Sequence, residues 1–179
     1  MEALKVVLIP ELERRGFVNI PLSKELAKDR DWRLTRPYGR FRRIAEDGFQ
    51  TMSIELNKYG GHKFRLSLGT VPKEGVKIAF GKIISQEDVW ADHLSIHYCL
   101  FKSKRRWSYF SVWRWPWQKT DKSHYFKLVE DVLKLLPEVE DVFSSGRCGP
   151  HIYRFDNKYG EANMRQMEKV KREKEQSNN

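Results

Sequence analysis

The chain has 179 residues, of which 34 are Lys or Arg and 24 are Asp or Glu, so its formal net charge is +10. This length suits one domain with its own core, and an aromatic content of 13% excludes a disordered chain. No apolar run approaches the roughly 20 residues of a membrane span, and two cysteines do not make a disulfide framework. We therefore expect a basic, globular, cytoplasmic protein with no membrane attachment.

The positive charge is unevenly distributed along the chain. Residues 1–60 carry 12 basic and 9 acidic side chains, residues 61–120 carry 11 and 4, and residues 121–179 carry 11 of each. The middle third therefore holds most of the excess. A basic surface attracts polyanions and acidic proteins alike, so charge alone does not choose between these partners.

The N-terminal segment predicts a helix over residues 2–15. Apolar residues from Leu4 to Leu12 recur at helical spacing, with Pro10 inside the stripe. Gly16 suits the left-handed position that follows a helix, which would let the next residue fold back onto it.

Residues 38–57 predict a β-hairpin. Asp47-Gly48 supplies the positive φ angles of a two-residue type I′ turn, so we place the turn there. This register puts Phe41 opposite Ile54 on an apolar face.

The same register has two consequences for charged residues. Arg40 falls opposite Glu55, as a cross-strand ion pair. Arg43 falls on the apolar face, where it is a misfit. It lies either at the margin of the sheet or in a register that differs from this one.

The rest of the chain alternates strand and helix patterns. A strand over 64–68 follows a Gly-Gly turn, so the sheet begins as a meander. The remaining predictions are a strand over 76–84, a helix over 85–93, strands over 94–101 and 107–113, a helix capped by Asp121 or Ser123 and stopped by Pro137, and a strand over 151–155.

Together these elements predict an α+β fold in one domain, residues 1–156. A single antiparallel sheet of five or six strands, a meander plus a hairpin, packs against the N-terminal helix and the helix near 121–136. Residues 157–179 are predicted as a charged C-terminal helix or tail.

The segment 101–119 is the strongest candidate for a binding surface. It holds six basic side chains, no acidic one and four of the six tryptophans. Tryptophans beside Lys and Arg suit stacking on unpaired bases, and they equally suit a protein hot spot.

A structural explanation of these tryptophans stays open. Trp107 and Trp113 fit a strand face buried against the following helix, whereas Trp115 and Trp117 flank a proline beyond the strand and are better candidates for exposure. The predicted residues for binding a partner or nucleic acid are Lys102, Lys104, Arg105, Arg106, Arg114, Trp115 and Trp117.

Six arginines between Arg30 and Arg43 form a second basic group. Carboxylates lie close to it in the sequence and can neutralise much of it, so we favour 101–119 as the binding surface. The stretch 23–37, which overlaps this group, is polar and predicts no regular element.

The sequence contains no motif for a nucleophile, a phosphate-cradling loop or a metal site. We therefore assign no catalytic residue, no metal ligand and no cofactor, and we favour a protein that is not an enzyme. A reaction centre assembled from dispersed residues, such as His62, His97 and Glu55, is the third alternative.

Four segments carry a resemblance to a known family: ERRGF, RRIAEDGFQTMSIELNKYGGHKFRLSLGTV, VWRWPW and LKLLPEVEDVF. In this order they resemble a bacterial domain family of unknown function, over about residues 1–143. The resemblance implies a small α+β domain and no catalytic residues. Such families often contain immunity or defence proteins, which implies a protein partner.

These observations lead to one functional expectation and one alternative. We expect a non-enzymatic binding module that engages the acidic surface of a protein partner through its basic, Trp-rich segment, in a setting of toxin immunity or defence. The alternative is a nucleic-acid-binding protein that uses the same surface.

Overall fold

The fold was determined from a computed structural model, which describes residues 2–59, 63–77, 83–103, 109–112 and 121–156. Its elements in chain order are η1 (Leu4–Leu8), α1 (Ile9–Arg14), β1 (Val18–Ile20), α2 (Lys24–Lys28), α3 (Arg30–Thr35), β2 (Arg40–Ala45), β3 (Gly48–Leu56), β4 (Phe64–Pro72), β5 (Val76–Lys77), β6 (Ile83–Ile84), η3 (Ala91–His93), β7 (Ile96–Leu100), α4 (Lys122–Ser145) and β8 (Ile152–Asp156).

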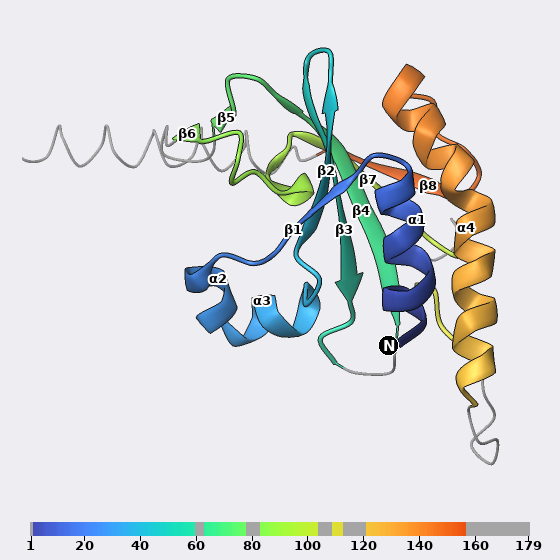
Figure 1. The fold of residues 1–179 in the computed structure, drawn as a ribbon. Coiled ribbons are helices and arrows are strands. Elements are labelled where there is room, and N and C mark those ends of the chain that lie inside the picture. Colours follow the sequence, from blue (N-terminus) through green and yellow to red (C-terminus); the bar gives the residue numbers. More distant parts are fainter. Residues whose placement is uncertain (1, 60–62, 78–82, 104–108, 113–120, 157–179) are drawn as a thin grey trace, which may run out of the picture.

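The main sheet is antiparallel and has six strands in the order β1-β2-β3-β4-β7-β8. Helices α1 and α4 lie side by side on one side of it, whereas α2 and α3 lie on the other side (Figure 1). The predicted α+β class, the meander and the two helices that pack on the sheet are confirmed.

The first helix agrees with the prediction, with one change in winding. Leu4–Leu8 form a π-helix ahead of α1, and Pro10 at the start of α1 has no N–H to donate. The helix ends before Gly16, whose φ of +84° is the left-handed value predicted for it, and the next residue, Phe17, is buried in the core.

The β2–β3 hairpin is confirmed, but its predicted register is wrong by two residues. The turn residues are Glu46 and Asp47, so Gly48 is the first residue of β3. Gly48 has a φ of +145°, and a Cβ there would lie 2.0 Å from the carbonyl oxygen of Val71 on β4. Both the close approach of β4 and this φ angle, which L side chains rarely adopt, therefore require a glycine here.

A shift by two residues leaves every side chain on its predicted face. Phe41 and Met52 are now directly opposite each other on the apolar face. The predicted ion pair between Arg40 and Glu55 is wrong, because Arg40 lies opposite Ser53.

The apolar face of the sheet and the helices α1 and α4 enclose the main core. Its largest fully buried side chains include Phe41, Phe64, Phe110, Leu8, Leu12, Met52, Ile54, Leu66, Leu68 and Leu100. The opposite face has a much smaller apolar cluster, centred on Val71, Val89 and Leu94.

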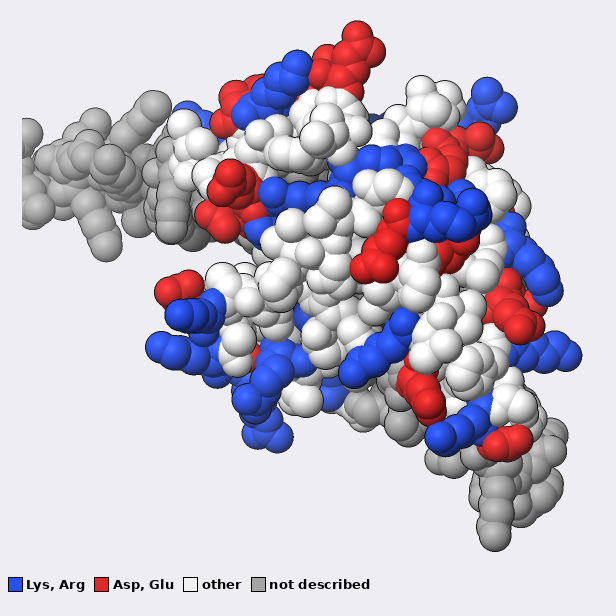
Figure 2. Space-filling view, in the orientation of Figure 1, with Lys and Arg blue, Asp and Glu red and all other residues white. Residues whose placement is uncertain are grey.

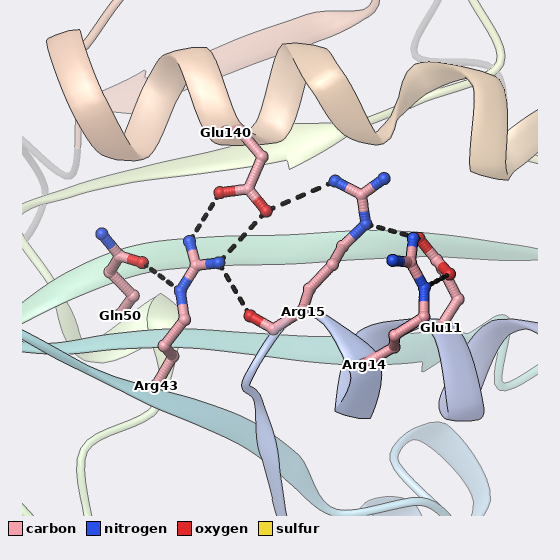
Figure 3. A network of polar contacts seen from close by, with 6 residues as sticks. All are labelled: Glu11, Arg14, Arg15, Arg43, Gln50 and Glu140. Carbon is pink, nitrogen blue, oxygen red and sulfur yellow. Dashed lines mark hydrogen bonds and ion pairs between the residues drawn. The ribbon is translucent and has the colours of Figure 1, made fainter.

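Arg43, the predicted misfit, lies at the margin of the apolar face. Its guanidinium donates to both carboxylate oxygens of Glu140 on α4, at 2.6 and 3.2 Å, and to the side chain of Gln50 at 2.8 Å. Figure 3 shows Glu140 reaching down from α4 to Arg43 and Arg15, while Arg15 also pairs with Glu11. The network joins α1, β2 and α4, and so explains an arginine at this position.

The segment between β4 and β7 departs furthest from the prediction. β5 and β6 pair with each other in a separate two-stranded sheet, so one strand over 76–84 is wrong. The predicted helix over 85–93 is also wrong, because Ser85 starts only a single turn and Trp90 is extended. Burial of Val89 and Leu94 against the sheet accounts for the extended path.

The stretch 23–37 contains two short helices, α2 and α3, where no element was predicted. The hydroxyl of Ser23 caps the first helix by accepting from the N–H of Leu26 at 3.3 Å. The carboxylate of Asp29 caps the second, accepting from the N–H groups of Asp31 and Trp32 at 2.8 and 3.2 Å. Ser and Asp are preferred N-caps, so this signal was present in the sequence.

The C-terminal elements largely agree with the predictions. Asp121 caps α4 as predicted, but Pro137 does not stop the helix, which continues to Ser145. The strands predicted over 94–101 and 151–155 are confirmed as β7 and β8. Of the strand predicted over 107–113, residues 109–112 are described, and they form only an isolated antiparallel bridge between Phe110 and Phe64. Residues 107, 108 and 113, and all of the tail 157–179, lie outside the described residues.

In the part of the chain that the structure describes, none of the helices has both the length and the apolar character needed to cross a membrane.

Candidate functional site

The predicted binding segment is described only in part. Lys102 is exposed, while Phe101 and Phe110 near the ends of the described stretches are buried. Phe110 stacks on Phe64 with ring centroids 5.4 Å apart. The other predicted binding residues, Lys104, Arg105, Arg106, Arg114, Trp115 and Trp117, lie outside the described residues.

The structure draws attention instead to the second face of the sheet, opposite the main core. Alternation of side chains along the strands brings several charged residues together there. Arg40 and Arg42 are only 8% and 7% exposed, and Glu55 is 7% exposed. We call this set the arginine layer, and it consists of Arg36, Arg40, Arg42, Arg65 and Glu55.

One half of the arginine layer is compensated by carboxylates. Glu55 accepts from Arg36 at 2.9 Å through one oxygen, and from Arg65 at 2.8 and 2.9 Å through the other. Arg36 also pairs with Asp92 of η3 at 2.8 Å. Burial pushes the pKa of Glu55 upward, but the charges of Arg65 and Arg36 outweigh burial and lower it below its ordinary value.

Two tryptophans pack against Arg36 and Arg40. The guanidinium of Arg36 lies 4.4 Å from the ring centre of Trp32 and 5.4 Å from that of Trp90. Arg40 lies 5.2 Å from the ring centre of Trp90, and the two indoles contact edge to face at 4.9 Å. These cation–π contacts connect α3 to the segment around η3 through the arginine layer.

The other half of the layer is not matched by carboxylates in this way. The Nη2 atoms of Arg40 and Arg42 both donate to one atom, the backbone carbonyl oxygen of Glu87. Arg42 donates in addition to the carbonyl of Gln86 at 2.8 Å. The carboxylate that pairs with Arg40 is that of Asp88, which is exposed and 3.9 Å away.

Burial and mutual repulsion act on these two arginines. Burial, together with the neighbouring charge of Arg42, lowers the pKa of Arg40 to about 10. Burial likewise lowers the pKa of Arg42. Both directions reflect the cost of burying a guanidinium charge, which the carboxylates of Glu87 and Asp88 offset only in part.

The remaining polar groups of this face are not arranged for catalysis. Burial raises the pKa of the Cys99 thiol to about 11, so the thiol is protonated at neutral pH, and it lies 3.3 Å from the hydroxyl of Ser67. Burial lowers the pKa of His97, whose ring stacks on Phe155 at 5.1 Å. For the alternative of a reaction centre assembled from dispersed residues, the described residues support one point, which is that His97 and Glu55 lie on the same face of the sheet. The third residue, His62, lies outside the described residues.

Within the described ranges, no three His, Cys, Asp or Glu side chains are grouped so that they could hold a metal ion. The layer offers guanidinium donors, which suit an anion.

The sequence favours residues 101–119 over this arginine group as the binding surface. Arg40 and Arg42 alternate along a predicted strand, which was the available signal that they share a face. The sequence did not indicate that the segment 85–93 would cover this face.

In comparisons with known proteins, no family model, no curated protein and no solved structure matches this chain. The resemblance to a bacterial domain family stays a prediction.

Proposed function

We propose that this protein is a non-enzymatic binding module for a protein partner with an acidic surface, and that the arginine face of the sheet takes part in binding. The proposal depends on one observation: exposed aliphatic side chains lie beside the buried arginines on the same face of the sheet. Ile44 is 83% exposed and Val18 is 62% exposed, although both lie in strands. Val18 is directly opposite Arg42, and Ile44 is two residues beyond it on the same face.

This combination favours a protein over a nucleic acid. Apolar side chains next to arginines are typical of protein interfaces, in which a few desolvated residues supply most of the binding energy. A nucleic acid would instead need a continuous basic surface that follows its phosphates. On the side of the molecule shown in Figure 2, the coloured basic and acidic side chains alternate and are separated by uncharged areas.

A single substitution tests the proposal. Ile44→Asp places a negative charge where an acidic partner would approach and removes an exposed aliphatic group, so partner affinity should fall by about tenfold or more. The measurement is affinity capture from a lysate of the source cells with the full chain, quantified by mass spectrometry. Proteins captured by the wild type should be lost by the variant.

Val6→Asp is the matched control. Val6 is 59% exposed but lies on η1, which packs against the other side of the sheet, so this variant should keep the wild-type partners. Equal capture by all three proteins would contradict the proposal. Capture that disappears after nuclease treatment would instead support the nucleic-acid alternative, for which steep salt dependence is the second sign.

A further inference from the structure

Arg40 and Arg42 meet at a single oxygen atom, the backbone carbonyl oxygen of Glu87. Two charged donors at one neutral carbonyl are an unusual pairing, because guanidinium groups bond most strongly to anionic oxygens. Both side chains are more than nine-tenths buried, so water cannot readily solvate their positive charges. Burial of a charge without an anionic partner is costly in free energy. An oxygen atom that carries negative charge would suit these two donors better than a neutral carbonyl oxygen.

Further unsatisfied donors lie on the two adjacent strands β2 and β3. The Nε atoms of Arg40 and Arg42 have no hydrogen-bond partner among the described residues. Ser53 lies directly opposite Arg40 on β3, is 2% exposed, and its hydroxyl is also without a hydrogen-bond partner there. Buried polar groups in proteins are nearly always satisfied, and three unsatisfied donors on adjacent strands need an explanation.

The geometry points to a phosphate-binding site formed by Arg40, Arg42 and Ser53, at the position that the Glu87 carbonyl occupies. A phosphate group carries about −1.5 to −2 charges at neutral pH, which matches two guanidinium groups. Its several oxygens accept donors from different directions, which suits donors that come from two adjacent strands. The site does not require a protein partner and so goes beyond the proposed function.

The turn Gln86–Asp88 competes with phosphate for this position. It covers the two arginines with its carbonyl oxygens, and phosphate can enter only when these oxygens move away. Ser85 holds the turn closed, since its carbonyl accepts from the N–H of Asp88 at 2.8 Å and its hydroxyl donates to the Asp88 carboxylate at 3.1 Å. Weakening the turn should therefore strengthen phosphate binding.

The test is a titration of the isotope-labelled full chain with inorganic phosphate at constant ionic strength, followed by amide NMR shifts, with chloride as the reference anion. We expect saturable shifts centred on Glu87 and Asp88 with phosphate and none with chloride. Arg42→Gln should weaken binding by about tenfold, and Ser53→Ala by about threefold. Ser85→Ala should strengthen it by about threefold, because it loosens the competing turn.

Arg30→Gln is the matched control, since Arg30 is an exposed arginine on α3 outside the arginine layer and its loss should leave binding unchanged. A parallel titration with methyl phosphate distinguishes two sources of the phosphate group. Tighter binding of inorganic phosphate indicates free phosphate, and tighter binding of methyl phosphate indicates a phosphoryl group carried by a larger molecule. Absence of saturation in the wild type, or equal binding by Arg42→Gln and Arg30→Gln, would overturn the site. Ser53→Ala and Ser85→Ala change affinity in opposite directions, so a general loss of folding cannot imitate the expected pattern.

Discussion

Glu55 is the residue on which the arginine layer depends most. It is a buried carboxylate from the central part of the sheet, and its two oxygens bond to Arg36 and Arg65 from different elements. Without it, the ion pairs of the described residues would leave Arg36 with Asp92 and Arg65 with no carboxylate. A buried charge that loses its partner is far more costly than an exposed one.

Glu55→Gln should therefore destabilise the protein by about 3 kcal/mol at neutral pH. The amide keeps the size of the side chain but not its charge. The decrease in the free energy of unfolding therefore measures the ionic part of the contact of Glu55 with Arg36 and Arg65. Urea unfolding followed by circular dichroism gives the free energy of unfolding. Glu74→Gln is the control, because Glu74 is exposed and its change should have almost no effect.

The same variant predicts a change in acid sensitivity. The pKa of Glu55 is lower in the folded chain than its ordinary value, so its stabilising contribution is complete above the ordinary value and is lost as pH falls through the folded-state pKa. The free energy of unfolding of the wild type should therefore decrease more steeply between pH 5 and about 2 than that of Glu55→Gln. Parallel pH profiles of the two proteins would disprove this role.

At the scale of elements, α4 contains an unusual proline. Pro137 lies within the helix and is exposed, so it removes one backbone hydrogen bond without adding a buried contact. The flanking residues Leu136 and Val139 are buried against the sheet. Tertiary packing of this apolar face keeps the helix continuous through a residue that normally ends helices.

Pro137→Ala should stabilise the protein by about 1–3 kcal/mol, because the alanine N–H restores the missing bond and alanine has the best helix propensity. The melting temperature and the urea midpoint should both rise. Lys134→Ala is a suitable control, since Lys134 is an exposed position one turn earlier with a weak surface ion pair to Asp131. An unchanged or lower stability of Pro137→Ala would mean that the proline ring contributes contacts that this interpretation omits.

The elements also show how far local patterns predict the fold. Alternation assigned each β2 and β3 side chain to its correct face, because the face depends only on period two. The register was missed because Gly48 is required by the approach of Val71 on β4, which is not local. Likewise, the cap of Asp29 is local and readable, whereas the path of the segment 85–93 depends on burial against a distant strand.

The candidate site was less predictable than the fold for the same reason. The spacing of Arg40 and Arg42 indicates a shared face, but their common partner is the carbonyl of Glu87, far along the chain. A backbone carbonyl has no sequence signature. The layer could therefore be recognised only after the tertiary contacts were known.

For the whole molecule, the two faces of the sheet are covered in different ways. On one face, α1 and α4 enclose an extensive apolar core. On the other face, α3 and the segment around η3 are held mainly by arginine contacts and by a cluster centred on three buried apolar residues, and α2 contacts α3. Apolar burial is the larger stabilising contribution, so the second covering should open more easily than the first.

Hydrogen exchange tests this difference directly. The amides of Ala27, Arg33 and His93 bond within the second covering, whereas those of Met52 and Ile54 belong to the central strand β3. After correction for intrinsic rates, the first group should exchange at least about tenfold faster, through openings that leave the main core intact. Equal protection in both groups would show that the molecule opens only as one unit. The turn Gln86–Asp88 belongs to this second covering, and an anion can reach Arg40 and Arg42 only when the turn opens. The phosphate site therefore requires that amides of the second covering exchange faster than those of β3.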